Sequence, residues 1–537
     1  MLILGSLLIP PAVIAVGTWI PLNNLAPDYI GTMLLLPDGT VMASDGGEAS
    51  WYRLTPDSSG SYVNGTWSTL SPMHDTRLYF ASDVLPNGKV FIAGGEYGTG
   101  EDTAEVYDPS SDTWTYAPTT TSLVQDFEDS ISTVLPNGNV LVAPVTPENY
   151  GGTVIYNTAF NSWSAGPTLF RGYDQAEASW VKLADGSILT IDPYGINSER
   201  YIPSLNKWIN DANVPVSLYD TNDELGAGLL LSDGRAFFLG GTGHTAIYTP
   251  TGTTNTGTWA AGPDLPDAQG TPDAPAAMMV NGKIICVTGP AQTYDGPVSF
   301  FEYDPVANSF TPVNAPDGSS ALESYVPYAT VMLDLPDGSV LFADFDFQLY
   351  VYQPDGSPLA SGTPTIHSIT LNADGSYHLT GTKLNGISQG AAYGDDAQMD
   401  SNYPLVRMTN SAGNVFYART YNWSSTGVMT GNTPVTTEFE LPAGLPLGQY
   451  SLVIVANGFS SNPVRFITLV PLQIALSGNL ALVSWPSSAT NVVLETTTNL
   501  VTGNWTVLTN GVVVVGSNFV LTNNANGRSA FYRLSGQ

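Results

Sequence analysis

A chain of 537 residues with 47 acidic and only 15 basic side chains has a formal net charge of −32, which excludes two classes of partner at the outset. A surface of that sign repels the phosphates of nucleic acids and of anionic membranes, so cations and neutral polyols remain as candidate ligands. Hydrophobic residues make up 43% of the chain, and the single cysteine, Cys286, excludes an intrachain disulfide and a thiolate-rich metal site.

The N-terminus has the pattern of an export signal. An apolar run from Leu2 to Ile9 is followed by two prolines and then by small apolar residues that end at Ala15. This pattern predicts a signal peptide over residues 1–15, although the basic segment that normally precedes it is missing, which indicates a truncated start. A buried first strand is the alternative. No stretch has the length of a transmembrane segment, so we expect a secreted or cell-surface protein.

A hairpin signal then recurs along the chain. Asn-Gly or Asp-Gly stands between two strand-like apolar runs, and its spacing of about 50 residues is the spacing of a kelch repeat, with one four-stranded blade per repeat. Such dipeptides predict type I′ turns. The turns are Asp38-Gly39, Asn87-Gly88, Asn137-Gly138, Asp185-Gly186, Asp233-Gly234, Asn281-Gly282 and Asp337-Gly338.

An aromatic residue opens the fourth strand of each repeat except the last. These residues are Trp67, Trp114, Trp163, Trp208, Trp259 and Phe310. The piece missing from the seventh repeat stands at the front of the chain, where Gly17-Thr18-Trp19 precedes the first turn. We therefore expect the N-terminal strand to complete the seventh blade, which removes exposed sheet edges.

The order of these parts resembles the kelch propellers. The resemblance implies an all-β fold: a seven-bladed kelch β-propeller over residues 16–356, with the N-terminal strand closing the last blade. Residues 359–470 resemble the early-set immunoglobulin-like β-sandwich that follows the propeller in galactose-oxidase-like proteins, through Pro404–Met408 and Gly448–Tyr450. Residues 472–537 form a third, small β-rich module, so two sandwich-like modules follow the propeller.

This architecture is that of the copper-radical oxidases, whose copper ion is held by two histidines and two tyrosines, one of them linked to a cysteine. Counting from the turn glycines, Tyr79 stands at the cysteine position and Asp129 at the linked tyrosine. Tyr328-Ala329 replaces the Tyr-His pair, and the stretch Ala418–Asn422 contains no histidine. We therefore expect neither copper nor copper-radical catalysis, and assign no catalytic residue.

The acidic residues suggest a different site. Residues just before the first strand of a blade and just after its second strand share one edge of the sheet, so we expect them on one face around the channel mouth. Our candidate ligand-binding residues there are Arg77, Tyr79, Asp129, Glu177, Glu224, Asp273, Tyr328, Asp344 and Asp346. Such a face would suit Ca²⁺, which prefers oxygen ligands, or a carbohydrate held by carboxylates and aromatic rings. The alternative is that these acids serve solubility alone.

The sequence thus favours a secreted or surface-attached binding protein for a glycan or a cationic ligand. Two alternatives stay open. One is a galactose-oxidase-like enzyme that acts on carbohydrate by non-copper chemistry, for example through the paired carboxylates of glycoside hydrolysis. The other is an interaction scaffold with an extracellular protein partner, since fold alone does not decide function.

Overall fold

The computed structural model describes residues 16–119, 123–127, 129–143, 146–147, 151–175, 177–393, 398–468, 472–487, 489, 492–501, 503–525 and 529–536. Secondary structure in this part of the chain is all β, apart from short 3-10 helices at Pro203–Leu205, Pro266–Ala268, Pro327–Ala329 (η3) and Ala360–Gly362. No helix among these residues is long and apolar enough to cross a membrane. The predicted signal peptide, residues 1–15, lies outside the described residues.

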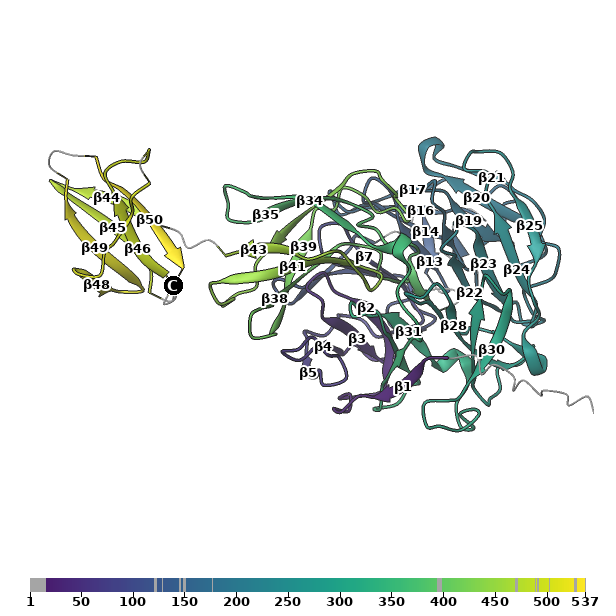
Figure 1. Cartoon of the computed structure of the whole chain (residues 1–537). Coiled ribbons are helices and arrows are strands. Elements are labelled where there is room, and N and C mark those ends of the chain that lie inside the picture. Colours follow the sequence, from purple (N-terminus) through teal and green to yellow (C-terminus); the bar gives the residue numbers. More distant parts are fainter. Residues whose placement is uncertain are drawn as a thin grey trace, which may run out of the picture. The chain divides into compact units, whose positions relative to one another are not determined.

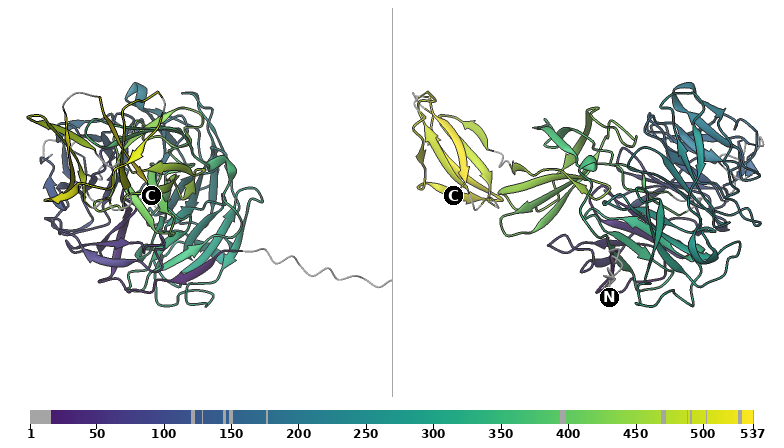
Figure 2. Two further views of the ribbon diagram at one scale, coloured as in Figure 1. Left: turned by 60° about the vertical axis from the view of Figure 1, so that its left-hand side comes forward. Right: turned by 45° about the vertical axis from the view of Figure 1, so that its right-hand side comes forward.

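The described part of residues 18–353 contains six antiparallel four-stranded sheets and four strands of a seven-stranded sheet, and we number these as sheets 1 to 7 in chain order (Figures 1 and 2). Sheet 1 has β2 (Ile30–Leu35), β3 (Val41–Asp45), β4 (Trp51–Thr55) and β5 (Thr66–Thr69); sheet 2 has β7 (Ala81–Val84), β8 (Val90–Ala93), β10 (Ala104–Asp108) and β11 (Thr113–Tyr116). Sheet 3 has β13 (Ile131–Val134), β14 (Val140–Ala143), β16 (Val154–Asn157) and β17 (Ser162–Ala165); sheet 4 has β18 (Val181–Lys182), β19 (Ile188–Ile191), β20 (Ser198–Ile202) and β21 (Lys207–Asn210). Sheet 5 has β22 (Leu225–Leu230), β23 (Ala236–Gly240), β24 (Thr245–Thr249) and β25 (Thr258–Ala261); sheet 6 has β27 (Ala276–Met278), β28 (Ile284–Pro290), β29 (Ser299–Asp304) and β30 (Ser309–Val313). Sheet 7 has β31 (Val331–Asp334), β32 (Val340–Ala343), β33 (Tyr350–Gln353) and, from the N-terminus, β1 (Thr18–Pro21).

All seven predicted turns connect the first strand of a sheet to its second, but the predicted type I′ geometry is wrong. In sheet 1, Gly39 N–H donates to the carbonyl of Leu36, and among the turn residues only the glycine has a positive φ, +75°. This is a type I turn followed by a glycine bulge. In sheet 1 Pro37 explains this, because its ring fixes φ near −65° where a type I′ turn needs a positive value; Pro86, Pro136 and Pro336 occupy the same position in sheets 2, 3 and 7. Sheets 4, 5 and 6 form the same turn without a proline.

The Asp or Asn before each turn glycine stabilises the turn through a side-chain hydrogen bond. The Asp38 carboxylate accepts a hydrogen bond from the backbone N–H of Thr40 at 3.1 Å. The corresponding residue of each of the other six turns accepts from the N–H two residues ahead in the same way, at 3.0 or 3.1 Å. A short side chain with an acceptor oxygen is needed for this Asx-type bond, which explains why the repeat keeps Asp or Asn there.

The N-terminal strand joins the last sheet, as the repeat count predicts. Strand β1 pairs with β33, with Trp19 opposite Tyr352, and the purple strand lies beside the green strands of sheet 7 in Figure 1. The Trp19 ring contacts Tyr352 at 4.6 Å and Phe300 of sheet 6 at 5.1 Å between centroids. This tryptophan therefore ties sheet 7 to its neighbour.

The core runs along the first and second strands of the sheets. Every residue of β2, β3, β7, β8, β13 and β14 is buried, whereas the fourth strands are largely exposed. First strands of neighbouring sheets contact one another: β2 with β31, β7 with β13, β18 with β22, β22 with β27, and β27 with β31. Strands covered on both faces read as continuous apolar runs, as they do in this sequence.

A hairpin from the tail lies among these first strands. Strand β36 (Gly390–Ala392) pairs with β27 of sheet 6 and with β37 (Gln398–Asp400). The two hairpin strands also contact β2, β7, β13, β22 and β31. The hairpin thus touches the innermost strands of six sheets. We call residues 390–400 the channel hairpin, of which 394–397 lie outside the described residues.

The chain divides into two compact units. The first contains residues 16–407, 417–441 and 453–462. In it, β34 (Thr365–Leu371) pairs with β35 (Tyr377–Thr382), β35 with β40 (Val435–Glu440), and Tyr421 of β39 (Val415–Tyr421) with Glu438. The second contains 408–416, 442–452 and 463–537, including β44 (Gln473–Ser477), β45 (Leu480–Pro486), β46 (Val492–Thr497), β47 (Thr506–Val507), β48 (Val512–Val515), β49 (Asn518–Asn524) and β50 (Phe531–Gly536), drawn in yellow in Figure 1.

Strands β44, β45, β49 and β48 form one sheet of the second unit, and β47, β46 and β50 another. Trp485 and Leu521 lie in the small core of this unit. The domain boundaries expected from the sequence stay predictions.

Candidate functional site

A cavity of about 500 Å³ in the first compact unit brings most of the predicted ligand residues together. Its described lining consists of Leu78, five tyrosines and five carboxylates: Tyr79, Tyr97, Tyr294, Tyr328, Tyr393, Glu96, Asp129, Glu177, Glu224 and Asp273. Six of the nine residues predicted from the sequence are among them: Tyr79, Asp129, Glu177, Glu224, Asp273 and Tyr328. The described lining includes no lysine, arginine, histidine or cysteine.

The repeat explains why these residues converge. Tyr79, Asp129, Glu177 and Asp273 occupy the same place in sheets 2, 3, 4 and 6, just before the first strand. Each has a positive φ, of 51°, 42°, 53° and 47° respectively. A left-handed backbone costs a non-glycine residue about 1 kcal/mol or more, and such strain clusters at functional sites. In sheet 5 the positive φ falls on Asp223, directly before Glu224.

The tyrosines form two groups of contacting rings. Tyr79 stacks on Tyr393 with 5.8 Å between ring centroids and meets Tyr97 edge-on at 6.4 Å. Tyr294 meets Tyr328 edge-on at 6.1 Å, and the hydroxyl of Tyr393 donates to the backbone carbonyl of Tyr328 at 2.6 Å. Tyr393 follows β36, so the channel hairpin supplies the residue that joins the two groups.

Three of the carboxylates lie close enough to share a ligand. One oxygen of each of Glu177, Glu224 and Asp273 lies within 4.8 Å of an oxygen of the other two. Two unit charges about 5 Å apart repel by about 3 kcal/mol at an effective dielectric constant of about 20. Glu224 is only 4% exposed. Burial, followed by the charges of Asp220 and Glu96, raises its pKa.

The hydrogen bonds of Glu224 leave one oxygen unused. The Tyr294 hydroxyl donates to Oε1, and the buried Oε2 accepts no hydrogen bond from the described protein. Asp273 can hydrogen-bond to Glu224 only when one of the two carboxylates holds a proton. The bond to Glu224 and burial together raise the pKa of the Tyr294 hydroxyl, which therefore stays a donor at neutral pH. The cluster thus presents an excess of acceptors over donors.

Arg77, Asp344 and Asp346 were also predicted to bind ligand, but they do not line this cavity. The fully buried Arg77 guanidinium donates to the carbonyls of Gly94 at 2.7 Å and Gly100 at 2.5 Å and pairs with Glu105 at 3.2 Å. It holds the loop after β8 in place. Asp344 is buried, which together with the nearby Asp346 charge raises its pKa to about 7. Asp346 accepts from the Tyr325 hydroxyl at 2.7 Å.

The lining residues that are not among the nine candidates come from two parts of the chain, the propeller-like repeats and the tail. Glu96, Tyr97 and Tyr294 follow the second strands of sheets 2 and 6, at the sheet edge where ligand-binding residues are expected; Glu96 meets this expectation but was not among the nine candidates. Tyr393 carries no such signal, because no repeat register applies to the tail. The family resemblance places the contribution of the tail at Ala418–Asn422, whereas Tyr393 is the tail residue in the described lining of the cavity.

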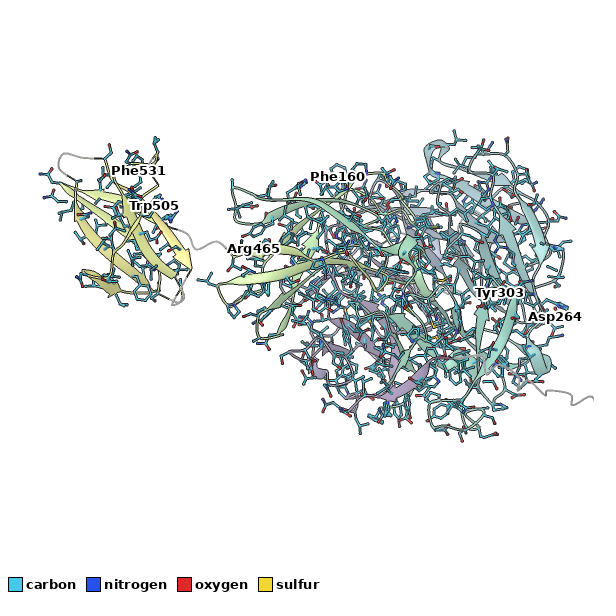
Figure 3. All side chains as sticks on the ribbon, in the orientation of Figure 1. Phe160, Asp264, Tyr303, Arg465, Trp505 and Phe531 are labelled. Carbon is cyan, nitrogen blue, oxygen red and sulfur yellow. The ribbon has the colours of Figure 1, made fainter. Side chains whose placement is uncertain are left out.

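The donors present do not fit the copper group that the family resemblance implies. Cys286 is fully buried in β28, and burial raises the pKa of its thiol to about 12. His74 Nδ1 lies 2.5 Å from Glu105, and His378 Nδ1 lies 2.7 Å from Glu438. His244 Nδ1 lies 2.8 Å from Asp264, which is labelled in Figure 3. The described lining therefore offers tyrosines without the histidine and thiol donors.

Comparison with known proteins identifies a kelch motif over residues 77–121. An F-box protein, AFR from Arabidopsis thaliana, is 48% identical over 56 residues, which is 10% of this chain and 15% of that protein. A galactose oxidase from Gibberella zeae is 29% identical over 121 residues, 20% of this chain and 17% of that protein. This chain thus spans less than a fifth of either relative.

Two solved structures are more distant. A fungal alcohol oxidase of the AA5 family in complex with copper has 14% identity and a TM-score of 0.49, with 85% of this chain and 99% of that chain covered. YCF48 bound to D1 peptide has 15% identity and a TM-score of 0.43, with 64% and 97% covered. The motif and the galactose oxidase match, together with the strand content, support an all-β fold of the kelch and galactose-oxidase type.

Proposed function

We propose that this protein is a secreted or cell-surface binding protein and that it recognises a carbohydrate in the cavity lined by five tyrosines and five carboxylates. The observation that carries the proposal is the composition of that lining. Tyrosine rings offer apolar faces that end in polar tips, and carboxylates accept hydrogen bonds from sugar hydroxyls. A cavity of about 500 Å³ lies within the ordinary range for small-ligand sites, which is roughly 300–1,000 Å³.

The fold supports this proposal by fixing the lining. We infer that the seven sheets are the blades of a closed kelch β-propeller and that β1 completes the seventh. The channel hairpin then occupies the axis and ends at the cavity, and the strands between 359 and 470 belong to an early-set immunoglobulin-like sandwich. In this arrangement the loops before the first strands of six blades, those of sheets 2 to 7, supply residues to one site.

The charge of the cavity selects among ligand classes. Five carboxylates without a described basic residue repel phosphorylated, sulfated and uronic-acid sugars, so neutral or amino sugars are the expected ligands. Protein partners remain the competing hypothesis, because kelch repeats often mediate protein interactions. A protein-binding scaffold would use the outer turns and fourth strands as readily as the cavity.

A glycan array followed by isothermal titration tests this function. We expect saturable binding of neutral or amino glycans. Tyr79→Ala should lower the glycan affinity at least tenfold, because it removes one ring of the stacked Tyr79–Tyr393 pair that lines the cavity. Tyr116→Ala, which removes a half-exposed tyrosine outside the cavity, is the matched control and should bind as the wild type does. An array without binding, or equal affinity in Tyr79→Ala, would contradict the proposal and favour the scaffold.

An enzyme that acts on sugars by non-copper chemistry is the second candidate, favoured by the match to galactose oxidase. Incubation of the glycans bound on the array with the protein, with and without added Cu²⁺, distinguishes binding from turnover. We expect unchanged glycans and no hydrogen peroxide. Copper-dependent peroxide would overturn the expected absence of copper-radical chemistry, and released sugar would indicate a hydrolase.

A further inference from the structure

We propose that Glu177, Glu224 and Asp273 form a binding site for a single Ca²⁺ ion within the cavity. This inference deepens the proposed function, and it rests on that function in one respect: the ion would also coordinate ligand hydroxyls. The three side chains come from the loops before the first strands of sheets 4, 5 and 6. They are thus held by three separate elements, and none of the three is a chain neighbour of another.

Geometry provides the first argument. Oxygen atoms of the three carboxylates lie within 4.8 Å of one another. A point at their centre is then at most about 2.8 Å from each oxygen, and a small inward rotation of the side chains brings this to the 2.3–2.6 Å typical of Ca²⁺. The donors are all hard oxygen atoms, which favour Ca²⁺ over the transition metals that prefer imidazole or thiolate. Three carboxylates supply three to six of the six to eight oxygens that Ca²⁺ requires, so positions remain for water or ligand hydroxyls.

The buried oxygen of Glu224 is the second, independent argument. Glu224 belongs to the cavity lining and is only 4% exposed, its Oε1 accepts a hydrogen bond from the Tyr294 hydroxyl, and its buried Oε2 accepts no hydrogen bond from the described protein. A buried acceptor without a partner is costly, and in native proteins it commonly indicates an unseen water, ion or ligand. Because an oxygen of Glu224 also lies within 4.8 Å of oxygens of two further carboxylates, a cation suits this side chain better than a neutral molecule does.

The surrounding charges favour a cation further. The other charged residues of the described lining are Glu96 and Asp129, which are both acidic, and no basic side chain of the described lining competes for the three carboxylates. Carboxylate ligands bind a cation only in their ionised form. Calcium affinity should therefore fall as the pH is lowered.

The test uses the full chain, freed of metal with a chelator and titrated with CaCl₂ alone. We expect one saturable site and a rise in melting temperature with Ca²⁺. Glu224→Gln and Asp273→Asn keep the size of the side chain but remove one charge each, and each should weaken Ca²⁺ at least tenfold. Glu96→Gln removes the same charge from the same cavity but lies outside the cluster, so it should change affinity less than threefold.

Two outcomes would overturn the site: no binding of Ca²⁺ at millimolar concentration, or a loss in Glu96→Gln equal to that in Glu224→Gln, which would indicate a diffuse ion atmosphere. Because Gln and Asn also relieve repulsion, the variants should melt no lower than the wild type without metal, so misfolding would be detected.

The glycan assay is run separately with Ca²⁺ and with chelator. Ca²⁺ binding without any glycan binding refutes the proposed function alone, whereas glycan binding that is equal under both conditions, with no Ca²⁺ binding, refutes the ion site alone.

Discussion

The carboxyl group of Asp334 shows how strongly a single residue in this molecule departs from its behaviour in water. It lies buried at the end of β31, and burial raises its pKa to about 8, although a hydrogen bond with Ser401 acts in the opposite direction. Its neighbour is Gly390 of the channel hairpin, where an added Cβ would lie 2.6 Å from Ser401 Oγ and 3.3 Å from Asp334 Oδ2. The hairpin therefore needs glycine at this point and a neutral Asp334 beside it.

This burial predicts how stability depends on pH. The folded chain keeps the Asp334 proton up to about pH 8, whereas the unfolded chain releases it near the ordinary value of 3.8. Between these values the folded state binds more protons, so stability is greatest below the unfolded pKa and falls as pH rises, by up to about 1.4 kcal/mol per pH unit for this group. Urea unfolding between pH 5 and 9 measures the slope, and Asp334→Asn should make it shallower.

Asp374→Asn is the matched control for this prediction. Asp374 is fully exposed and its pKa is lowered by hydrogen bonds from Ser376, so it is already ionised throughout the range from pH 5 to 9. Its substitution should leave the slope unchanged. An equal slope in the wild type and Asp334→Asn would show that Asp334 releases its proton in the folded state.

Other buried ionisable groups around the channel hairpin have the same origin. Burial raises the pKa of Asp400 to about 7 and that of Asp83 to about 6, and it lowers the pKa of Lys182. The Lys182 ammonium donates to the carbonyls of Val134 and Thr426, both at 3.0 Å. None of these residues could be distinguished in the sequence, because their burial depends on a hairpin from a distant part of the chain.

At the level of elements, β1 is the segment whose role was predicted most directly. It occupies the outer edge of sheet 7, and its backbone pairs with β33 from Thr18 to Pro21. Besides its ring contacts, the Trp19 indole donates to the carbonyl of Asn314 at 2.9 Å, and the Gly17 N–H donates to Glu302 at 3.1 Å. The short strand β1, with Gly17 before it, thus connects the N-terminal segment to sheets 6 and 7.

Trp19 is only half-buried, so we expect Trp19→Ala to lower the free energy of unfolding by about 1–2 kcal/mol, less than the roughly 3–5 kcal/mol for a fully buried aromatic ring. Deletion of residues 16–22 should cost more, because it also exposes the edge of β33. Denaturant unfolding measures both. Phe160→Ala removes an aromatic ring that is 80% exposed and labelled in Figure 3, and should change stability by less than about 0.5 kcal/mol. If Trp19→Ala and Phe160→Ala have the same effect, β1 does not stabilise sheet 7.

The elements also show where sequence reasoning succeeded and where it could not. The turn positions follow from local chemistry, since Asp or Asn before glycine serves the same hydrogen bond each time. Turn type could not be read from the Asp-Gly or Asn-Gly pair alone: a proline precedes the pair in four turns, but the three turns without proline have the same hydrogen bond and the same positive φ at glycine only. The channel hairpin could not be foreseen, because Gly390–Ala392 pairs with Ala276 and Ala277, more than a hundred residues away. Tyr393 was missed for the same reason.

At the scale of the whole molecule, the excess of acidic residues acts on both solubility and stability. The cavity concentrates five of the 47 acidic residues, and most of the others are spread over loops and turns. A net charge of −32 repels itself across the folded protein more strongly than across an expanded chain, so it opposes compaction. The cavity and the surface are therefore both negatively charged, and cations should stabilise the folded protein at both places.

Salt separates the two contributions. The Debye length falls from about 30 Å at 0.01 M to about 8 Å at 0.15 M ionic strength, so monovalent salt screens repulsion across the surface. With a chelator present to remove Ca²⁺, we expect the melting temperature to rise steadily from 0.01 to 0.15 M NaCl. Choline chloride should raise it by the same amount, because screening needs no specific binding site. Micromolar to millimolar Ca²⁺ added at 0.15 M NaCl should then raise it again in the wild type but much less in Glu224→Gln. A melting temperature independent of NaCl would show that surface repulsion is negligible, and an equal Ca²⁺ response in both proteins would assign the effect of calcium to the surface instead of the cavity.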